Sequence, residues 1–98
     1  MKLKENSRKV YDYVLAHEDE DITALDIAKA VGLSDKQVNG IVTMAFQRHK
    51  EEIDGVKTEV PLMVRIPAEQ TLEDGTHKPI KFIKLTDEGR ELEIEDAD

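Results

Sequence analysis

The 98-residue chain contains no cysteine, no tryptophan and only two tyrosines and two phenylalanines. The absence of cysteine excludes disulfide bonds, thiolate chemistry and zinc sites with sulfur ligands. No apolar run approaches the roughly 20 residues that a membrane-spanning helix needs. The charged start M-K-L-K-E-N-S-R-K is not followed by the apolar core of a signal peptide. We therefore expect one domain of a reducing compartment, located in the cytoplasm and without contact to a membrane.

Catalytic and metal-binding signatures are also missing. The three histidines, at positions 17, 49 and 77, do not stand at metal-ligand spacing with one another or with carboxylates. The sequence has no G-x-S-x-G, P-loop or G-x-G-x-x-G motif. Its paired carboxylates lie in polar runs, where nothing would raise a pKa for acid–base work. We expect no catalytic residue, no metal site and no cofactor, and hence a protein that is not an enzyme.

Basic residues are too few for a protein that holds DNA by bulk electrostatics, since the formal net charge is −8. The acidic excess is confined to two segments. Residues 18–23 carry four carboxylates and no base, and residues 86–98 carry seven carboxylates and one base. The segments between them are neutral, and residues 1–17 have four bases against two acids. This pattern is compatible with a nucleic-acid contact outside the acidic loop and tail.

Residues 23–42 have the pattern of two short helices joined by a tight turn. Two pairs have the spacing of helix capping boxes: Thr23 with Asp26, and Ser34 with Gln37. Gly32 stands where the turn needs a backbone conformation that costs a residue with a Cβ about 1 kcal/mol or more. Ala28, Val38 and Ile41 are spaced to pack the two helices together. The segment therefore predicts a helix-turn-helix, although two ordinary helices of a bundle would have the same core residues.

The remaining elements follow from capping residues, prolines and apolar periodicity. We expect a flexible N-terminus over residues 1–6 and a first helix from Arg8 to about His17, capped by Ser7. The third helix should run from Asp35 to about Lys50, and Asp54-Gly55 marks a turn. Residues 62–66 and 80–85 should pair as a hairpin with a long polar tip. Thr86 should cap a last short helix over residues 87–94, and residues 93–98 form an acidic tail.

The order helix, helix, helix, hairpin, short helix resembles the winged-helix family over residues 7–92. The segment F-I-K-L-T-D-E-G-R-E-L (82–92) is similar to the end of the wing and the start of the last helix in MarR-type regulators. The resemblance implies an α+β fold with a three-helix core, a two-stranded β-hairpin wing and a short C-terminal helix. It also implies a third helix in the major groove and a wing near the minor groove or backbone. Two departures are the missing room for long dimerisation helices and an acidic wing tip with Glu69, Glu73 and Asp74.

The outward face of the third helix is the expected DNA-contact surface. Lys36 suits a phosphate or a guanine edge, Asn39 and Gln47 suit adenine, and Thr43 suits a thymine methyl group. Glycine within a helix costs about 1 kcal/mol relative to alanine, so Gly40 indicates a close backbone approach. The predicted DNA-binding residues on this helix and its cap are Ser34, Lys36, Gln37, Asn39, Gly40, Thr43 and Gln47. The predicted phosphate contacts are Arg8, Lys9, Lys29 and Lys50.

These features predict sequence-specific binding of double-stranded DNA in transcriptional regulation. A single domain with few bases should bind weakly, which implies a homodimer, a tandem site or a partner protein. The alternative is an acidic winged-helix module that binds proteins rather than DNA, as a component of a transcription or replication complex or as a DNA mimic. The net charge favours that alternative, with the acidic tail or the wing tip as the contact. A solvated helix face would have the same composition, so both hypotheses stay open at this stage.

Overall fold

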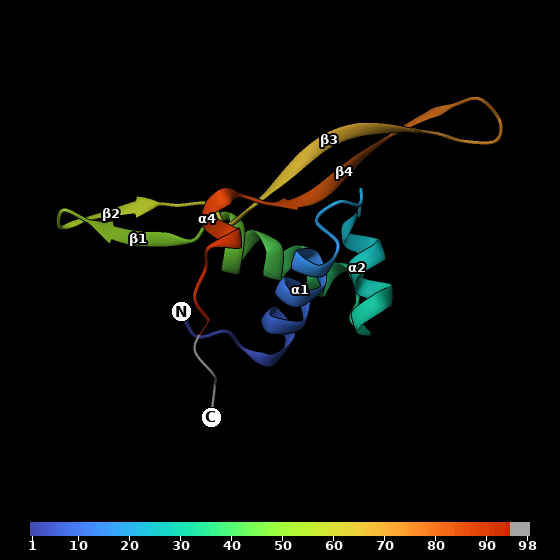
Figure 1. Ribbon diagram of the computed structural model, residues 1–98. Coiled ribbons are helices and arrows are strands. Elements are labelled where there is room, and N and C mark those ends of the chain that lie inside the picture. Colours follow the sequence, from blue (N-terminus) through green and yellow to red (C-terminus); the bar gives the residue numbers. More distant parts are fainter. Residues whose placement is uncertain (95–98) are drawn as a thin grey trace.

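The computed structural model describes residues 1–94, which form an α+β fold with a helical body and two projecting hairpins (Figure 1). In this part of the chain the α-helices are α1 (Glu5–Ala16), α2 (Ala24–Val31), α3 (Asp35–Ile41) and α4 (Asp87–Arg90), and η1 (Val42–Gln47) is π-helical. The strands are β1 (Lys50–Ile53), β2 (Val56–Glu59), β3 (Met63–Thr71) and β4 (His77–Leu85), which form two antiparallel pairs. Within residues 1–94 no helix is long and apolar enough to cross a membrane.

The core lies between the helices and the base of β3 and β4. Tyr11 of α1 and Phe46 of η1 are its largest members, and their rings stack with centroids 5.9 Å apart. Ile83 of β4 is tied to the body by its backbone N–H, which donates to the Ile22 carbonyl at 2.8 Å. The other fully or nearly fully buried side chains are Val10, Val14, Ile27, Ala28, Val38, Val42, Leu62 and Met63.

The N-terminal segment differs from the prediction. Helix α1 begins at Glu5 and ends at Ala16, and its N-cap is Lys4, which makes no side-chain capping bond. Ser7 lies inside the helix and is buried, so its predicted capping role is wrong. Leu3 is only 6% exposed and belongs to the core, and the N-terminal amine donates to the Glu93 carbonyl at 3.0 Å. Residues 1–6 are therefore part of the packed domain rather than a separate leader.

The two capping boxes and the turn between α2 and α3 are confirmed. In both boxes the cap hydroxyl accepts from the backbone N–H three residues on, and that residue's side chain accepts from the cap N–H. Gly32 ends α2 with φ +75°, the left-handed conformation that only glycine adopts without strain. These local signals fix where α3 begins and therefore which of its residues face outward.

The third helix ends earlier than predicted and changes its winding. In an ideal α-helix the eight residue steps from Val38 to Phe46 leave Phe46 about 80° around the axis from Val38, which would turn Phe46 away from the core. The π-helical segment has more residues per turn, so the step from Val42 to Phe46 completes nearly a full turn. Val42 and Phe46 are both fully buried as a result. Lys50, predicted to be the last helical residue, is the first residue of β1.

The hairpin of β1 and β2 was predicted only as a turn. Asp54 and Gly55 both have positive φ, 51° and 79°, as a two-residue type I′ hairpin turn requires. The chain returns to the body through two backbone bonds: Val60 N–H donates to the His49 carbonyl at 2.7 Å, and Leu62 N–H to the Phe46 carbonyl at 2.9 Å. Residues 50–59 thus form an insertion between the end of the third helix and β3.

The second hairpin is confirmed, but its strands are longer than expected. Pairing continues to Thr71 opposite His77, so most of the predicted polar tip (68–78) is strand. Pro67 and Pro79 are accommodated because each strand of a two-stranded ribbon has an unpaired edge. The turn is reduced to residues 72–76, closed by the Leu72 N–H to the Thr76 carbonyl at 2.8 Å. The result is a long arm that projects from the body (Figure 1).

The last helix is confirmed in place and cap but is shorter than predicted. Thr86 Oγ1 accepts from the Gly89 N–H at 3.0 Å and donates to the Pro61 carbonyl at 2.7 Å. Helix α4 ends at Arg90 instead of residue 94. Of the predicted acidic tail, residues 93–94 have no regular secondary structure and residues 95–98 lie outside the described part.

Candidate nucleic-acid interface

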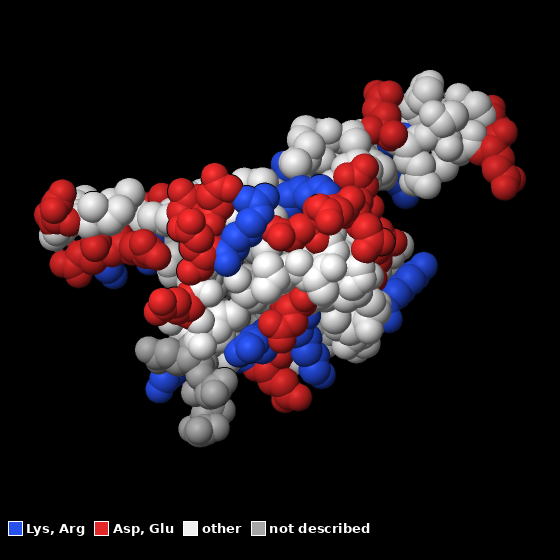
Figure 2. All heavy atoms as spheres, in the orientation of Figure 1, with Lys and Arg blue, Asp and Glu red and all other residues white. Residues whose placement is uncertain are grey.

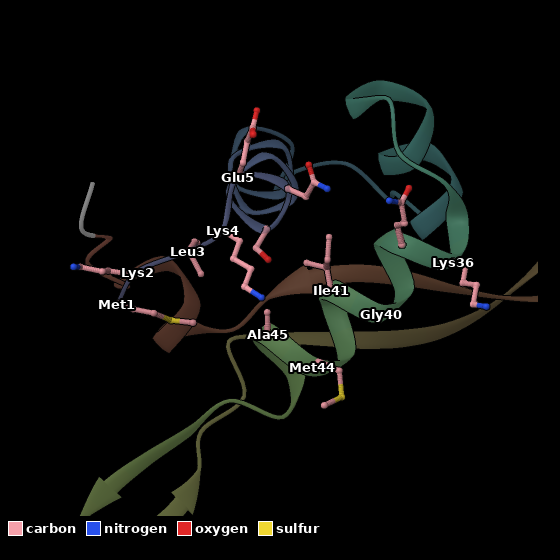
Figure 3. A pocket seen from close by; sticks show the side chains of 13 residues that line it. Met1, Lys2, Leu3, Lys4, Glu5, Lys36, Gly40, Ile41, Met44 and Ala45 are labelled. Atoms are coloured by element: carbon pink, nitrogen blue, oxygen red, sulfur yellow. The ribbon is translucent and has the colours of Figure 1, made fainter. Parts of the chain in front are cut away.

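The outward face of α3 and η1 lies beside the N-terminal segment, and together they line an open groove of about 940 Å³ (Figure 3). The helical side of the groove includes Lys36, Gly40 and Met44, which are four residues apart and all exposed. A four-residue step keeps side chains on one face of a helix. Met44 is 66% exposed. The face therefore presents to a partner a positively charged side chain, exposed backbone at Gly40 and a large apolar side chain.

Ser34 and Gln37 lie at the start of this face and are partly committed to the helix cap. The Gln37 Oε1 atom accepts from the Ser34 N–H at 2.9 Å, and the Ser34 Oγ accepts from the Gln37 N–H at 3.0 Å. Both side chains are exposed. The cap uses the Gln37 carbonyl oxygen and leaves its NH₂ group to donate to a partner.

The predicted base-contacting residues Asn39, Thr43 and Gln47 are half-buried instead of fully outward. The Asn39 Nδ2 donates to the Asp35 carbonyl at 3.0 Å and to its carboxylate at 3.2 Å. The wider π-helical turn also rotates Thr43 and Gln47 away from the line of Lys36, Gly40 and Met44. Of the predicted base-contacting face, Lys36 and Gly40 are therefore exposed, whereas Asn39, Thr43 and Gln47 are half-buried against the chain.

Arg65 of β3 links the long hairpin to α3 and η1. Its guanidinium donates to the Thr43 hydroxyl at 2.8 Å and to the Asn39 carbonyl at 3.2 Å. Burial lowers the pKa of Arg65, but an arginine still carries its charge at neutral pH. Arg65 therefore positions the hairpin against α3 and η1.

Two of the four predicted phosphate contacts, Arg8 and Lys9, are paired within α1. Arg8 Nε lies 3.1 Å from the Asp12 carboxylate, and Lys9 Nζ lies 3.8 Å from Glu5. Both are exposed or half-exposed pairs, which contribute little to stability and can open. They can turn toward a phosphate at small cost.

The other two predicted phosphate contacts, Lys29 and Lys50, lie on different elements of the fold. Lys29 is exposed on α2. Lys50 belongs to β1 and so does not extend the face of α3. The N-terminal Lys2 and Lys4 fall in the predicted flexible N-terminus, but they line the groove. The signal that could have placed them is Leu3, an apolar residue seven positions before Val10 on the buried side of α1.

Acidic side chains are spread over both hairpins and the body in the view of Figure 2, with bases scattered among them. At the tip of the long hairpin, Asp74 accepts from the Thr76 hydroxyl at 2.6 Å and from the Thr76 N–H at 3.0 Å. These bonds lower the pKa of Asp74. Together with Glu69 and Glu73, its carboxylate makes the tip region acidic. The tip is therefore poorly suited to a phosphate backbone, unlike the face of α3.

Comparison of the chain with protein-family models, with characterised proteins and with solved structures gives no match.

Proposed function

We propose that this protein is a winged-helix domain that binds double-stranded DNA in transcriptional regulation and inserts α3 into the major groove. Lys36, Gly40 and the Gln37 amide would approach the base edges, because all three residues are exposed on α3. Lys29, Arg8 and Lys9 would contact phosphates. The Arg65 contacts would hold the base of the long hairpin at a fixed angle to α3.

Gly40 carries this proposal. A Cβ built on Gly40 would meet no atom of the described chain within 4 Å. Its backbone is helical, so neither internal packing nor conformation requires a glycine there. Glycine in a helix nevertheless costs about 1 kcal/mol relative to alanine. A close approach by an external partner explains why this position lacks a side chain, and the groove of B-DNA admits an α-helix at such a distance.

The Gly40→Ala variant separates stability from binding. We expect it to raise the free energy of unfolding by about 1 kcal/mol, through helix propensity alone. We expect the same change to weaken duplex binding several-fold, because the added methyl group stands where the backbone approaches the bases. Urea unfolding and fluorescence anisotropy with a labelled duplex measure the two effects. A variant that is stabilised and binds as well as the original chain would contradict the role assigned to Gly40.

The direct test is titration of a mixed-sequence duplex at low and moderate salt. We expect micromolar affinity that falls as salt rises, with a log–log slope that counts the phosphates contacted. Lys36→Glu should abolish this binding. Lys57→Glu is the matched control, since it makes the same charge change on exposed β2, outside the row on α3. Because both lysines are exposed, neither change should alter the far-ultraviolet circular dichroism spectrum.

The alternative function, an acidic module that binds proteins, is favoured by the charged tip of the long hairpin and by the net charge of −8. It predicts no duplex binding at any salt concentration and equal behaviour of the two lysine variants. A result of that kind at both low and moderate salt would replace the DNA proposal with this one.

A further inference from the structure

The β1–β2 hairpin takes no part in the proposed DNA contact, and nothing in the described chain covers it. All eight of its strand residues are exposed. A lone two-stranded hairpin is marginally stable in water. Ile53 and Val56 face each other across its turn and are 47% and 63% exposed. The hairpin thus presents an apolar tip to solvent, and a surface that covers this tip would stabilise it.

The groove beside α3 has the complementary character. Its floor is apolar, with Leu3, Ile41, Met44 and Ala45 among its lining residues. Lys2, Lys4 and Lys36 line it as well, with Glu5 as the one carboxylate. The hairpin carries the opposite charge: its carboxylates Glu51, Glu52, Asp54 and Glu59 outnumber its bases Lys50 and Lys57.

We propose that two copies of this chain exchange their β1–β2 hairpins, each docking into the groove of the other copy. The dimensions agree, because a four-residue strand spans about 13 Å and the helix from Lys36 to Met44 extends about 12 Å. The apolar tip would contact Met44 and Ile41, and the hairpin carboxylates would face the lysines of the groove. This mode buries both apolar surfaces and pairs their charges.

The position of the hairpin favours a closed dimer over a chain of molecules. Met44 and Ala45 line the groove, and β1 begins five residues after Ala45. The β1–β2 hairpin therefore leaves the body beside the groove (Figure 3). The β1–β2 hairpin also points away from the body and so away from its own groove (Figure 1). A two-fold axis near the start of β1 would bring the β1–β2 hairpin of each copy to the groove of the other copy, as a self-complementary interface requires.

The proposed dimer goes beyond the proposed function and does not depend on it. Lys36 and Gly40 belong both to the groove and to the DNA-contact row, so a docked hairpin would cover the face that meets the duplex. Self-association and DNA binding would then exclude each other. By linkage, duplex DNA would shift the protein toward monomers by the same factor by which dimerisation weakens its DNA affinity.

Sedimentation velocity on the DNA-free chain tests the dimer separately from DNA binding. We expect the sedimenting mass to rise from one chain to two as the concentration increases. Val56→Glu should raise the dissociation constant at least about tenfold, since it places a charge on the apolar tip. Leu72→Glu is the control, because it makes a similar change at the turn of the other hairpin, where Leu72 is 40% exposed. A chain that stays monomeric at all concentrations would overturn the proposal, and so would a dimer indifferent to Val56→Glu.

Charge reversal gives a stricter test of the exchange. One variant carries Glu51→Lys and Glu52→Lys on the hairpin, and the other carries Lys4→Glu and Lys36→Glu in the groove. Each alone should be monomeric, because its hairpin and groove then have charge of the same sign. An equal mixture should form a heterodimer, since both of its hairpin–groove contacts again join opposite charges. Failure of the mixture to associate, where the unmodified chain dimerises, would show that the dimer uses another surface.

Discussion

Replacing Gly89 by alanine is expected to lower the free energy of unfolding by about 3 kcal/mol, at the upper end of the usual range for overpacking. Gly89 is buried in α4 against the loop before β3. A Cβ at this position would lie 2.0 Å from the Leu62 carbonyl oxygen and 3.0 Å from the Leu85 side chain. The obstructing atom is backbone, so a side-chain rotation cannot relieve the clash. Helix α4 would have to move away from the core.

This movement would also break a buried hydrogen bond. The Tyr11 hydroxyl donates to the Gly89 carbonyl at 2.6 Å and joins α1 to α4. Chemical denaturation monitored by circular dichroism measures the loss. Glu88→Ala is the control, because Glu88 is exposed on the same short helix and should change stability by less than about 0.5 kcal/mol. If Gly89→Ala were as stable as that control, the close approach of α4 to Leu62 would be wrong.

Truncation of Phe46 to alanine is expected to lower the free energy of unfolding by about 3–5 kcal/mol, as for other fully buried aromatic residues. Phe46 is 0% exposed and stacks on Tyr11, so the change removes packing from the centre of the core. A domain of this size is typically stable by only about 5–15 kcal/mol. The variant should therefore be partly unfolded at moderate temperature.

Met44→Ala is the matched comparison for Phe46→Ala. Met44 lies two residues earlier in the same π-helical segment and is 66% exposed, so its loss should be within about 0.5 kcal/mol. Thermal unfolding of both variants tests the winding of η1. In a continuous α-helix, Phe46 would be turned from the core and the difference between the two variants would shrink. Equal unfolding temperatures would therefore contradict the π-helical register.

The parts of the fold that the sequence predicts are those determined by neighbouring residues. The Thr23 and Ser34 caps, the left-handed Gly32 and the Thr86 cap each depend on contacts within three or four positions. The burial of Phe46 could not be predicted in this way, because it depends on the change to π-helical winding, for which no single residue is a sequence signal. The need for glycine at position 89 was not predicted either. The sequence shows a glycine in a short helix, and only the fold shows that the Leu62 backbone lies against it.

The candidate site was predictable to a similar degree. Lys36 and Gly40 were placed on the outward face, since α3 begins where its cap predicts. The half-buried positions of Asn39 and Thr43 were not predicted, because Asn39 donates to the Asp35 carbonyl and Thr43 accepts from Arg65, which is 22 residues away in the sequence. The β1–β2 hairpin had one local signal, the Asp54-Gly55 turn between Ile53 and Val56. Its strands lack clear apolar alternation, so the signal was interpreted as a turn alone.

The Arg65 contacts have a mechanical consequence. Arg65 is the third residue of a nine-residue strand, so about 20 Å of β3 extends beyond the point where the guanidinium holds α3. The long hairpin therefore acts as a lever whose short end is attached to α3 and η1. A force on the acidic tip would be transmitted to Asn39 and Thr43 as a torque on the helix, instead of being lost in a loose hinge at the base.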